Sequence, residues 1–138
     1  MQNRPIYRLK ERDWVDRTED VLRTFDQQAA SHRHFEMFPL THSDYAFVQA
    51  IDETEEPINN PPPDPEADAA FGNAMRTWMD MPPAERRPHI DTLAKQIEPT
   101  EVVDVSYKVL ANIRNDRFNE MEYSVPLAAG PASSQVCK

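Results

Sequence analysis

Glycine is scarce in this chain, and its scarcity excludes several kinds of phosphate-binding site. The sequence has two glycines, Gly72 within a helical pattern and Gly130 near the C-terminus, beside 13 prolines. A Walker loop and a GxGxxG fingerprint both need several glycines in one short turn, because the backbone there must approach a phosphate closely. Neither can form here. A nucleotide cofactor, if one serves this protein, must be held by another segment.

Cysteine is rarer still, and long apolar runs are absent. The only cysteine is Cys137, so an intrachain disulfide and a cysteine-based metal site are both excluded. No stretch approaches the roughly 20 apolar residues of a membrane-spanning helix, and the first ten residues lack the apolar centre of a secretory signal. These features predict a soluble, cytoplasmic protein.

Positive charge is also in short supply. Lys and Arg number 15 against 24 Asp and Glu, which gives a formal net charge of -9. Such a chain is repelled by a polyphosphate backbone, so nucleic acid is not an expected partner. The length of 138 residues allows one domain of ordinary size.

Hydrophobic periodicity predicts strands and a helix in the first part of the chain. A strand is expected over residues 6–11, and an amphipathic helix over residues 17–31 begins with a capping box at Asp16. Two strands, 34–38 and 45–51, follow with a short link between them. The second is apolar at nearly every position, which is typical of a strand buried on both faces.

The second part of the chain begins with an acidic, proline-rich segment, 53–64, which predicts an exposed loop. Helices are expected over 65–80 and 88–98, each started by a proline and ended by another. Strands are then expected over 103–109 and 118–125, where apolar and polar residues alternate.

This order of elements favours a single α+β domain. The links between successive strands are tight and no regular βαβ crossover is present, so an antiparallel sheet with helices on one face is expected. Residues 127–138 are small and polar and carry no structural signal of their own. They are predicted to be a disordered tail.

Two segments carry a resemblance to a known family. The first includes Trp14-Val-Asp-Arg-Thr-Glu-Asp-Val-Leu, Phe25-Asp and His32-Arg-His-Phe-Glu-Met-Phe38-Pro39, and the second is Arg117-Phe-Asn-Glu-Met-Glu-Tyr-Ser-Val-Pro126. Together they resemble the C-terminal domain of the D-arabinono-1,4-lactone and L-gulono-1,4-lactone oxidases, which are vanillyl-alcohol-oxidase-like flavoproteins. The resemblance covers roughly residues 4–126.

The resemblance implies a fold, a reaction and two partners. The fold is an antiparallel sheet with flanking helices that caps a separate FAD-binding domain. The reaction is oxidation of a sugar 1,4-lactone by hydride transfer to the flavin, which oxygen or another acceptor then reoxidises. The implied partners are the FAD-binding domain and the sugar lactone, and the parent enzyme is either cytoplasmic or associated with a membrane.

The sequence also departs from the family pattern. Members resembling it have the FAD domain before this segment, and they continue after the second segment with a helix, a Glu-x-Arg strand and a His-Trp-x-Lys segment. Here Pro126 is followed by Leu-Ala-Ala-Gly-Pro. Residues 1–126 are therefore expected to be an incomplete cap domain that binds no cofactor and is inactive alone. The alternative is a non-catalytic α+β protein-interaction module that binds a partner through the sheet face an FAD domain would cover.

Glu120 and Glu122 are candidate substrate-side groups on the last predicted strand. Residues two apart on a strand share a face about 7 Å apart, and two such carboxylates can raise one another's pKa and bind or deprotonate a sugar hydroxyl. The alternative is a solvated strand face, or an ion pair with Arg114 or Arg117.

A second candidate group lies around the strand predicted at 34–38. His32, His34 and Glu36 are expected to alternate onto one face, with His42 a short turn away. Imidazole and carboxylate are usual zinc ligands, but a lone His-x-His is a weak signal and the resemblance supports no metal. No metal site is predicted, and His34 and Glu36 remain candidates for the substrate side.

Overall fold

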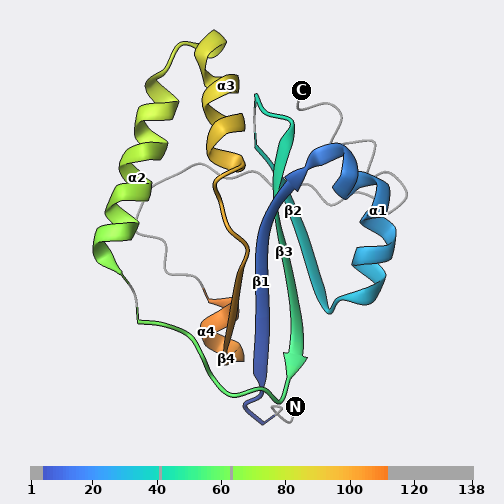
Figure 1. The fold of residues 1–138 in the computed structure, drawn as a ribbon. Helices are drawn as coiled ribbons and strands as arrows, with labels where there is room; N and C mark the ends of the chain where they lie inside the picture. The colour runs from blue at the N-terminus through green and yellow to red at the C-terminus, as the bar shows by residue number, and fades with distance from the viewer. Residues whose placement is uncertain (1–4, 41, 63, 112–138) are drawn as a thin grey trace.

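The computed structural model describes residues 5–40, 42–62 and 64–111. Their four strands form one antiparallel sheet in the order β2-β3-β1-β4. In chain order the elements are β1 (Arg8–Arg17), α1 (Thr18–Ser31), β2 (His34–Pro39), β3 (Tyr45–Thr54), α2 (Pro65–Asp80), α3 (Pro83–Ala94), β4 (Thr100–Val105) and α4 (Ser106–Leu110). Figure 1 shows α1 on the β2 side of the sheet and the α2–α3 hairpin on the β4 side. The predicted α+β class and antiparallel sheet are confirmed.

One face of the sheet packs against α1 and holds most of the core. Phe25 of α1 lies edge-on to Phe35 of β2, with ring centroids 5.5 Å apart. Successive side chains of a strand point to opposite faces, so the strand register assigns every residue to this face or the other. We call this face the α1 face. Its fully or nearly fully buried side chains are Ala46, Val48, Ala50 and Val103.

The opposite face, which we call the α4 face, has a smaller apolar cluster at one end. Leu9 of β1 and Ile51 of β3 pack with Val109 of α4, and Tyr7 lies against them. Helices therefore lie on both faces, and the expectation of helices on one face alone was wrong. The alternation of residues 103–109 predicted one longer strand, but the chain turns helical at Ser106. Val109 of this helix is buried against Leu9 and Ile51 on the α4 face.

Three other element boundaries differ from the prediction. β1 continues to Arg17 rather than ending near residue 11, and Arg17, not Asp16, is the N-cap of α1 and makes no side-chain cap. α3 begins at Pro83, a favourable first helical position, and accommodates Pro88 inside its first two turns. The predicted helix 65–80 is confirmed as α2.

β3 is buried mainly on one face, which corrects the prediction of burial on both. Ala46, Val48 and Ala50 on the α1 face are buried, whereas Tyr45, Phe47 and Gln49 on the α4 face are only partly so. The α4 face of the sheet therefore remains accessible among the described residues. No helix in the described part of the chain has both the length and the apolar character needed to cross a membrane.

The edge strand β4 is partly closed by the loop that follows β3. The backbone N–H of Asn59 donates to the Val103 carbonyl at 3.1 Å, and the Asn59 side-chain oxygen accepts from the Val103 N–H at 2.6 Å. The next residue, Asn60, donates to Asp104 at 2.8 Å. This loop protects part of an otherwise open sheet edge and confirms an exposed, irregular segment where the proline-rich sequence predicted one.

Candidate functional site

Polar side chains from three strands meet in the middle of the α4 face. The register aligns Glu36 of β2, Gln49 of β3 and Asp13 of β1 in one row across the sheet. The adjacent row contains His34 of β2, Ile51 of β3 and Glu11 of β1. Directly paired residues on one face have Cβ atoms about 5 Å apart, so these groups lie close enough to contact one ligand. We call this set the polar band: Glu11, Asp13, His34, Glu36 and Gln49.

Two carboxyl groups and one amide at the centre of the band interact directly. The Gln49 Nε2 donates to the Asp13 Oδ1 at 3.1 Å. Glu11 is half-buried, and this burial, with the neighbouring charge of Asp13 and a hydrogen bond between the two side chains, raises the pKa of Glu11 to about 7. A carboxyl group with that pKa exchanges its proton near neutral pH, which is the range that suits acid–base work and mixed hydrogen bonding.

Apolar side chains border the polar band at both ends. Phe38 and Phe47 are paired across β2 and β3 with ring centroids 6.3 Å apart, and Phe38 is half exposed. At the other end lies the cluster of Leu9, Ile51 and Val109. A surface that combines hydrogen-bonding groups with flanking apolar side chains suits a ligand with both hydroxyl groups and C–H faces.

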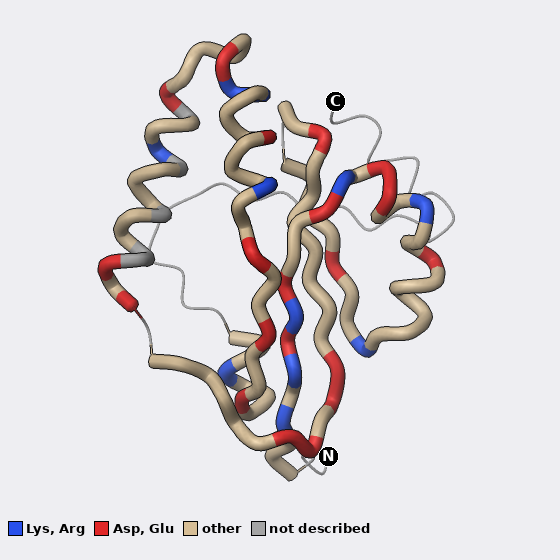
Figure 2. The backbone as a smooth tube through the Cα atoms, viewed as in Figure 1, with Lys and Arg blue, Asp and Glu red and all other residues tan. Residues whose placement is uncertain are grey.

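The cations in the first part of β1, Arg8, Lys10 and Arg12, lie on the opposite face and are neutralised there. Arg8, Lys10 and Arg12 alternate with Leu9, Glu11 and Asp13, and Figure 2 shows this alternation of blue and red along the strand. On the α1 face Lys10 pairs with Glu56 and with Glu101, each at 2.8 Å. The neighbouring cations pair in the same way, Arg8 with Glu55 and Arg12 with Glu101. Residues 8–13 thus place their cations and their carboxyl groups on opposite faces of the sheet.

A cleft of about 440 Å³ lies on the α1 face between α1, β1 and the start of β4. Its wall includes Trp14, Gln28 and His32. The His32 Nδ1 lies 2.6 Å from an Asp52 carboxylate oxygen, and the Arg33 N–H donates to the other oxygen at 2.9 Å. Burial opposes ionisation of Asp52, but these two hydrogen bonds outweigh it and hold the pKa of Asp52 below its usual value. The pair fastens the end of α1 to β3.

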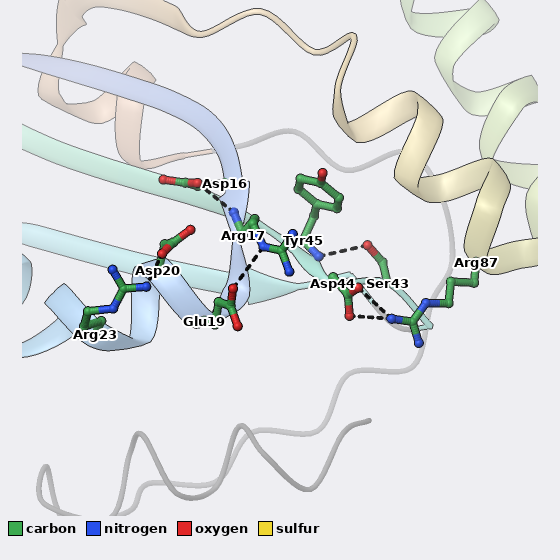
Figure 3. A network of polar contacts seen from close by, with 9 residues as sticks. All are labelled: Asp16, Arg17, Glu19, Asp20, Arg23, Ser43, Asp44, Tyr45 and Arg87. Atoms are coloured by element: carbon green, nitrogen blue, oxygen red, sulfur yellow. Dashed lines mark hydrogen bonds and ion pairs between the residues drawn. The ribbon is translucent and has the colours of Figure 1, made fainter.

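The turn between β2 and β3 is fastened to α3. Both Asp44 carboxylate oxygens lie 2.6 Å from one nitrogen of Arg87, and Ser43 Oγ donates to Asp91 at 3.2 Å. Figure 3 shows Ser43 also accepting a hydrogen bond from the Tyr45 N–H. These contacts hold the α2–α3 hairpin to the β2–β3 turn. The two helices of the hairpin contact each other more than either of them contacts any strand. Their role is structural, because none of the residues that make them belongs to the polar band.

The structure brings together only part of the predicted site. His34 and Glu36 lie in the polar band, but the ring of His32 is on the α1 face beside Asp52, which corrects the expectation that all three share a face. His42 lies in the β2–β3 turn with φ 64° and lines a separate hollow of about 300 Å³ next to α3. Within residues 5–40, 42–62 and 64–111, no three His, Cys, Asp or Glu residues are grouped so that they could hold a metal.

Several of the residues singled out from the sequence fall outside the described residues. Glu120 and Glu122, their alternative partners Arg114 and Arg117, and the predicted tail 127–138 are all in this category. Their assignments remain predictions.

Sequence reasoning missed the centre of the site. Glu11, Asp13 and Gln49 were not singled out, because the first strand was predicted to end at residue 11 and no strand pairing was assigned. The available signal was the sign alternation in Arg8-Leu-Lys-Glu-Arg-Asp13, which places both carboxylates on one face of any strand that continues past residue 12.

Fold and site together define a class: an α+β domain whose antiparallel sheet presents a polar, acidic face. The comparison with protein families is more specific. The model of the D-arabinono-1,4-lactone oxidase family matches residues 1–135, and the chain belongs to that family. It is therefore a member of an aldonolactone oxidoreductase family, and the resemblance predicted from its two motifs is confirmed.

Two curated relatives support the same family. The chain is 26% identical to an L-gulono-1,4-lactone dehydrogenase of Mycobacterium tuberculosis strain CDC 1551 / Oshkosh, over 98% of this chain and 33% of the relative. The L-gulono-1,4-lactone dehydrogenase of strain ATCC 25618 / H37Rv matches with the same figures. The chain thus spans about a third of the length of the curated relatives it matches.

Proposed function

We propose that this chain forms the substrate-facing part of an FAD-linked oxidoreductase that oxidises a sugar 1,4-lactone of the D-arabinono or L-gulono type. The observation that carries the proposal is the polar band on the α4 face of a family member. Asp13 and Glu36 offer acceptors for sugar hydroxyls, and Gln49 offers both a donor and an acceptor. Phe38 and Phe47 offer an apolar border for the C–H side of the ring.

The role of these residues under the proposal is to bind and orient the lactone. Ionised carboxylates accept strong hydrogen bonds from hydroxyl groups, and a fixed array of acceptors selects one orientation of a polyhydroxylated ring. Because the pKa of Glu11 is raised, its carboxyl group can be protonated near neutral pH and can then donate a hydrogen bond. The polar band can therefore donate hydrogen bonds as well as accept them.

FAD does not fit the described residues of this chain. Its diphosphate needs a positive or glycine-rich cradle, whereas the accessible α4 face carries Glu11, Asp13 and Glu36. Arg8, Lys10 and Arg12 of β1 are engaged in ion pairs on the other face. The flavin would be held by a separate FAD-binding domain that docks against this chain. The isolated chain is then expected to be colourless and inactive with lactones.

The test replaces the matched third of the M. tuberculosis L-gulono-1,4-lactone dehydrogenase with this chain and measures lactone-dependent reduction of an electron-accepting dye. We expect turnover, and we expect Asp13→Asn to lower kcat/KM about tenfold, as loss of one charge-assisted hydrogen bond would. The matched control is Glu101→Gln, a carboxylate on the α1 face, which should change kcat/KM less than twofold, within the small effect of an exposed ion pair.

Two results would count against the proposal. One is a folded chimera that turns over no lactone. The other is an Asp13→Asn variant that is as active as the Glu101→Gln control. If the chimera does not fold, NMR of this chain with D-arabinono-1,4-lactone decides instead, because binding to the polar band must shift the amide signals of β1 and β3 around Asp13 and Gln49 and leave those of α3 unchanged.

A further inference from the structure

The α4-face side chains of β2 form an exposed stripe that changes from apolar to polar along the strand. Phe38, Glu36 and His34 follow one another at intervals of two residues, and all three are exposed. Residues two apart on one face of a strand are about 7 Å apart. A ligand that lies along β2 on this face therefore meets an aromatic ring, a carboxyl group and an imidazole in a fixed order.

The neighbouring strands continue the apolar end of this stripe. The register places Phe47 of β3 and Val15 of β1 in one row with Phe38, and the side chains of this row can neither donate nor accept an ordinary hydrogen bond. The next row holds Glu36 and the other hydrogen-bonding groups at the centre of the polar band, and the row after it begins with His34. The α4 face therefore has an apolar end at Phe38 and a polar end at His34.

A sugar 1,4-lactone has the same two kinds of surface. Its five-membered ring carries hydroxyl groups on two adjacent carbons, and a chain of hydroxyl-bearing carbons extends from the ring. When the ring hydroxyls are bound in the row of Glu36, the exocyclic chain extends toward either Phe38 or His34. A chain directed at Phe38 would leave its hydroxyl groups without partners, which is unfavourable for any buried polar group. The direction toward His34 is therefore favoured.

His34 has the chemistry to bind the hydroxyl groups of that chain. An imidazole ring has an N–H donor and, in its neutral form, an acceptor nitrogen. Within the described part of the chain, no hydrogen bond or ion pair joins the His34 side chain to another residue. In the same row Ile51 of β3 is buried and apolar, and Glu11 of β1 lies two strand spacings away, about 10 Å. His34 is therefore the nearest hydrogen-bonding side chain of its row to a ligand on β2.

We propose that His34 is a specificity-determining residue that selects lactones by the length of the exocyclic chain. A six-carbon 1,4-lactone has one more hydroxyl-bearing carbon in that chain than a five-carbon lactone. His34 binds this additional hydroxyl group, whereas Phe38 and Glu36 contact the ring, which both lactones have. The assignment rests on the proposed function, because it takes a sugar lactone as the ligand of the polar band.

The test uses the chimera described above with two substrates, L-gulono-1,4-lactone, which has six carbons, and D-arabinono-1,4-lactone, which has five. The measured quantity is the ratio of kcat/KM for the six-carbon lactone to kcat/KM for the five-carbon lactone. His34→Ala should lower this ratio about tenfold, as loss of one hydrogen bond to a substrate hydroxyl would. His34→Gln, which keeps a donor and an acceptor, should restore part of the ratio.

Two further variants separate selection by His34 from a general loss of structure. His42→Ala removes a histidine of the β2–β3 turn, outside the polar band, and should leave the ratio unchanged. Phe38→Leu should lower kcat/KM for both lactones by a similar factor, because both have a five-membered ring. A purely structural role of His34 would give the result expected for Phe38→Leu. An unchanged ratio in His34→Ala, with both lactones still oxidised, would overturn this inference and leave the proposed function standing.

The remaining outcomes decide the question as well. A folded wild-type chimera that oxidises neither lactone contradicts the proposed function and this inference together. If the chimera does not fold, the dissociation constants of the two lactones for this chain replace kcat/KM, measured from the NMR shifts of the β2 amide signals. His34→Ala should then weaken binding of the six-carbon lactone about tenfold relative to the five-carbon one. Equal weakening of both, or no binding of either lactone to the wild-type chain, counts against the selection.

Discussion

On the α1 face of β1 each cation meets a carboxylate from a neighbouring segment, whereas on the α4 face the carboxyl groups of the same strand meet an amide and each other. Lys10 is held by Glu56 and Glu101, whereas Glu11, the next residue, shares its face with the carboxyl group of Asp13. The α1 face also holds three of the buried side chains of β3, Ala46, Val48 and Ala50. Period-2 alternation in a strand of alternating charge therefore separates a neutral, structural face from an acidic, accessible one.

The comparison predicts that the two faces tolerate new charge very differently, and this is the largest expected effect. Val48 is fully buried on the α1 face, so Val48→Asp should lower the free energy of unfolding by more than about 3 kcal/mol. Gln49→Asp, one residue further on the α4 face, should cost about 1 kcal/mol through repulsion by its row neighbours. Urea unfolding followed by circular dichroism measures both. Equal losses would show that the faces do not differ as described.

The next prediction concerns the contact that fastens α1 to its face. Asp52→Asn should lower the free energy of unfolding by about 1 to 2 kcal/mol at pH 6, because it weakens the hydrogen bonds to His32 and to the Arg33 N–H. The folded-state pKa of Asp52 is lowered, so the stabilisation is present above its ordinary value of 3.8 and is lost as pH falls through the folded pKa. The free energies of unfolding of the wild type and the variant should therefore become equal in acid. A difference that persists at pH 2 would assign the effect to packing.

A smaller effect of opposite sign is expected on the α4 face. The pKa of Glu11 is raised from 4.5 to about 7, so the folded state loses stability as pH rises through that interval, while below it both states are protonated. Glu11→Gln removes this cost and should stabilise the chain by about 1 kcal/mol at pH 8, after allowance for partial exposure, with no gain at pH 4. Thermal unfolding of the variant and the wild type at the two pH values measures this difference in stability. A variant less stable than the wild type at pH 8 would contradict the assignment of Glu11 as a destabilising group.

Sequence patterns correctly predicted those helices and strands whose formation depends on residues within the segment itself. The helix at Pro65–Asp80 is determined by its N-terminal Asp64-Pro65 and its apolar spacing, and both signals lie within the segment. The strand at His34–Pro39 follows from two-residue alternation in the same way. These predictions needed no tertiary information.

The errors came from contacts between distant segments. Residues 106–110 alternate like a strand, but they form α4 because Val109 packs with Leu9 and Ile51, roughly 60 to 100 residues away in sequence. β1 extends past residue 11 because β3 and β4 pair with it. The polar band depends on the same pairing. His34 and Glu36 were found from alternation within β2, whereas Gln49 and Asp13 become neighbours only through the register of β3 with β1.

The smallest expected effect tests whether the ion pairs of the α1 face stabilise the fold or only neutralise it. Arg8 lies 3.2 Å from Glu55, whose side chain is fully exposed, so solvent screens the attraction. Arg8→Gln should change the free energy of unfolding by less than about 0.5 kcal/mol, and 0.5 M salt should not alter the wild type by more than that amount. Chemical unfolding at low and high salt measures both. Because Arg8 points away from the polar band, the same variant should leave the Glu11 titration near 7 unchanged. A shift of that midpoint in Arg8→Gln would mean that the two faces are electrostatically coupled through the strand, and the separation of charge by alternation would then be incomplete.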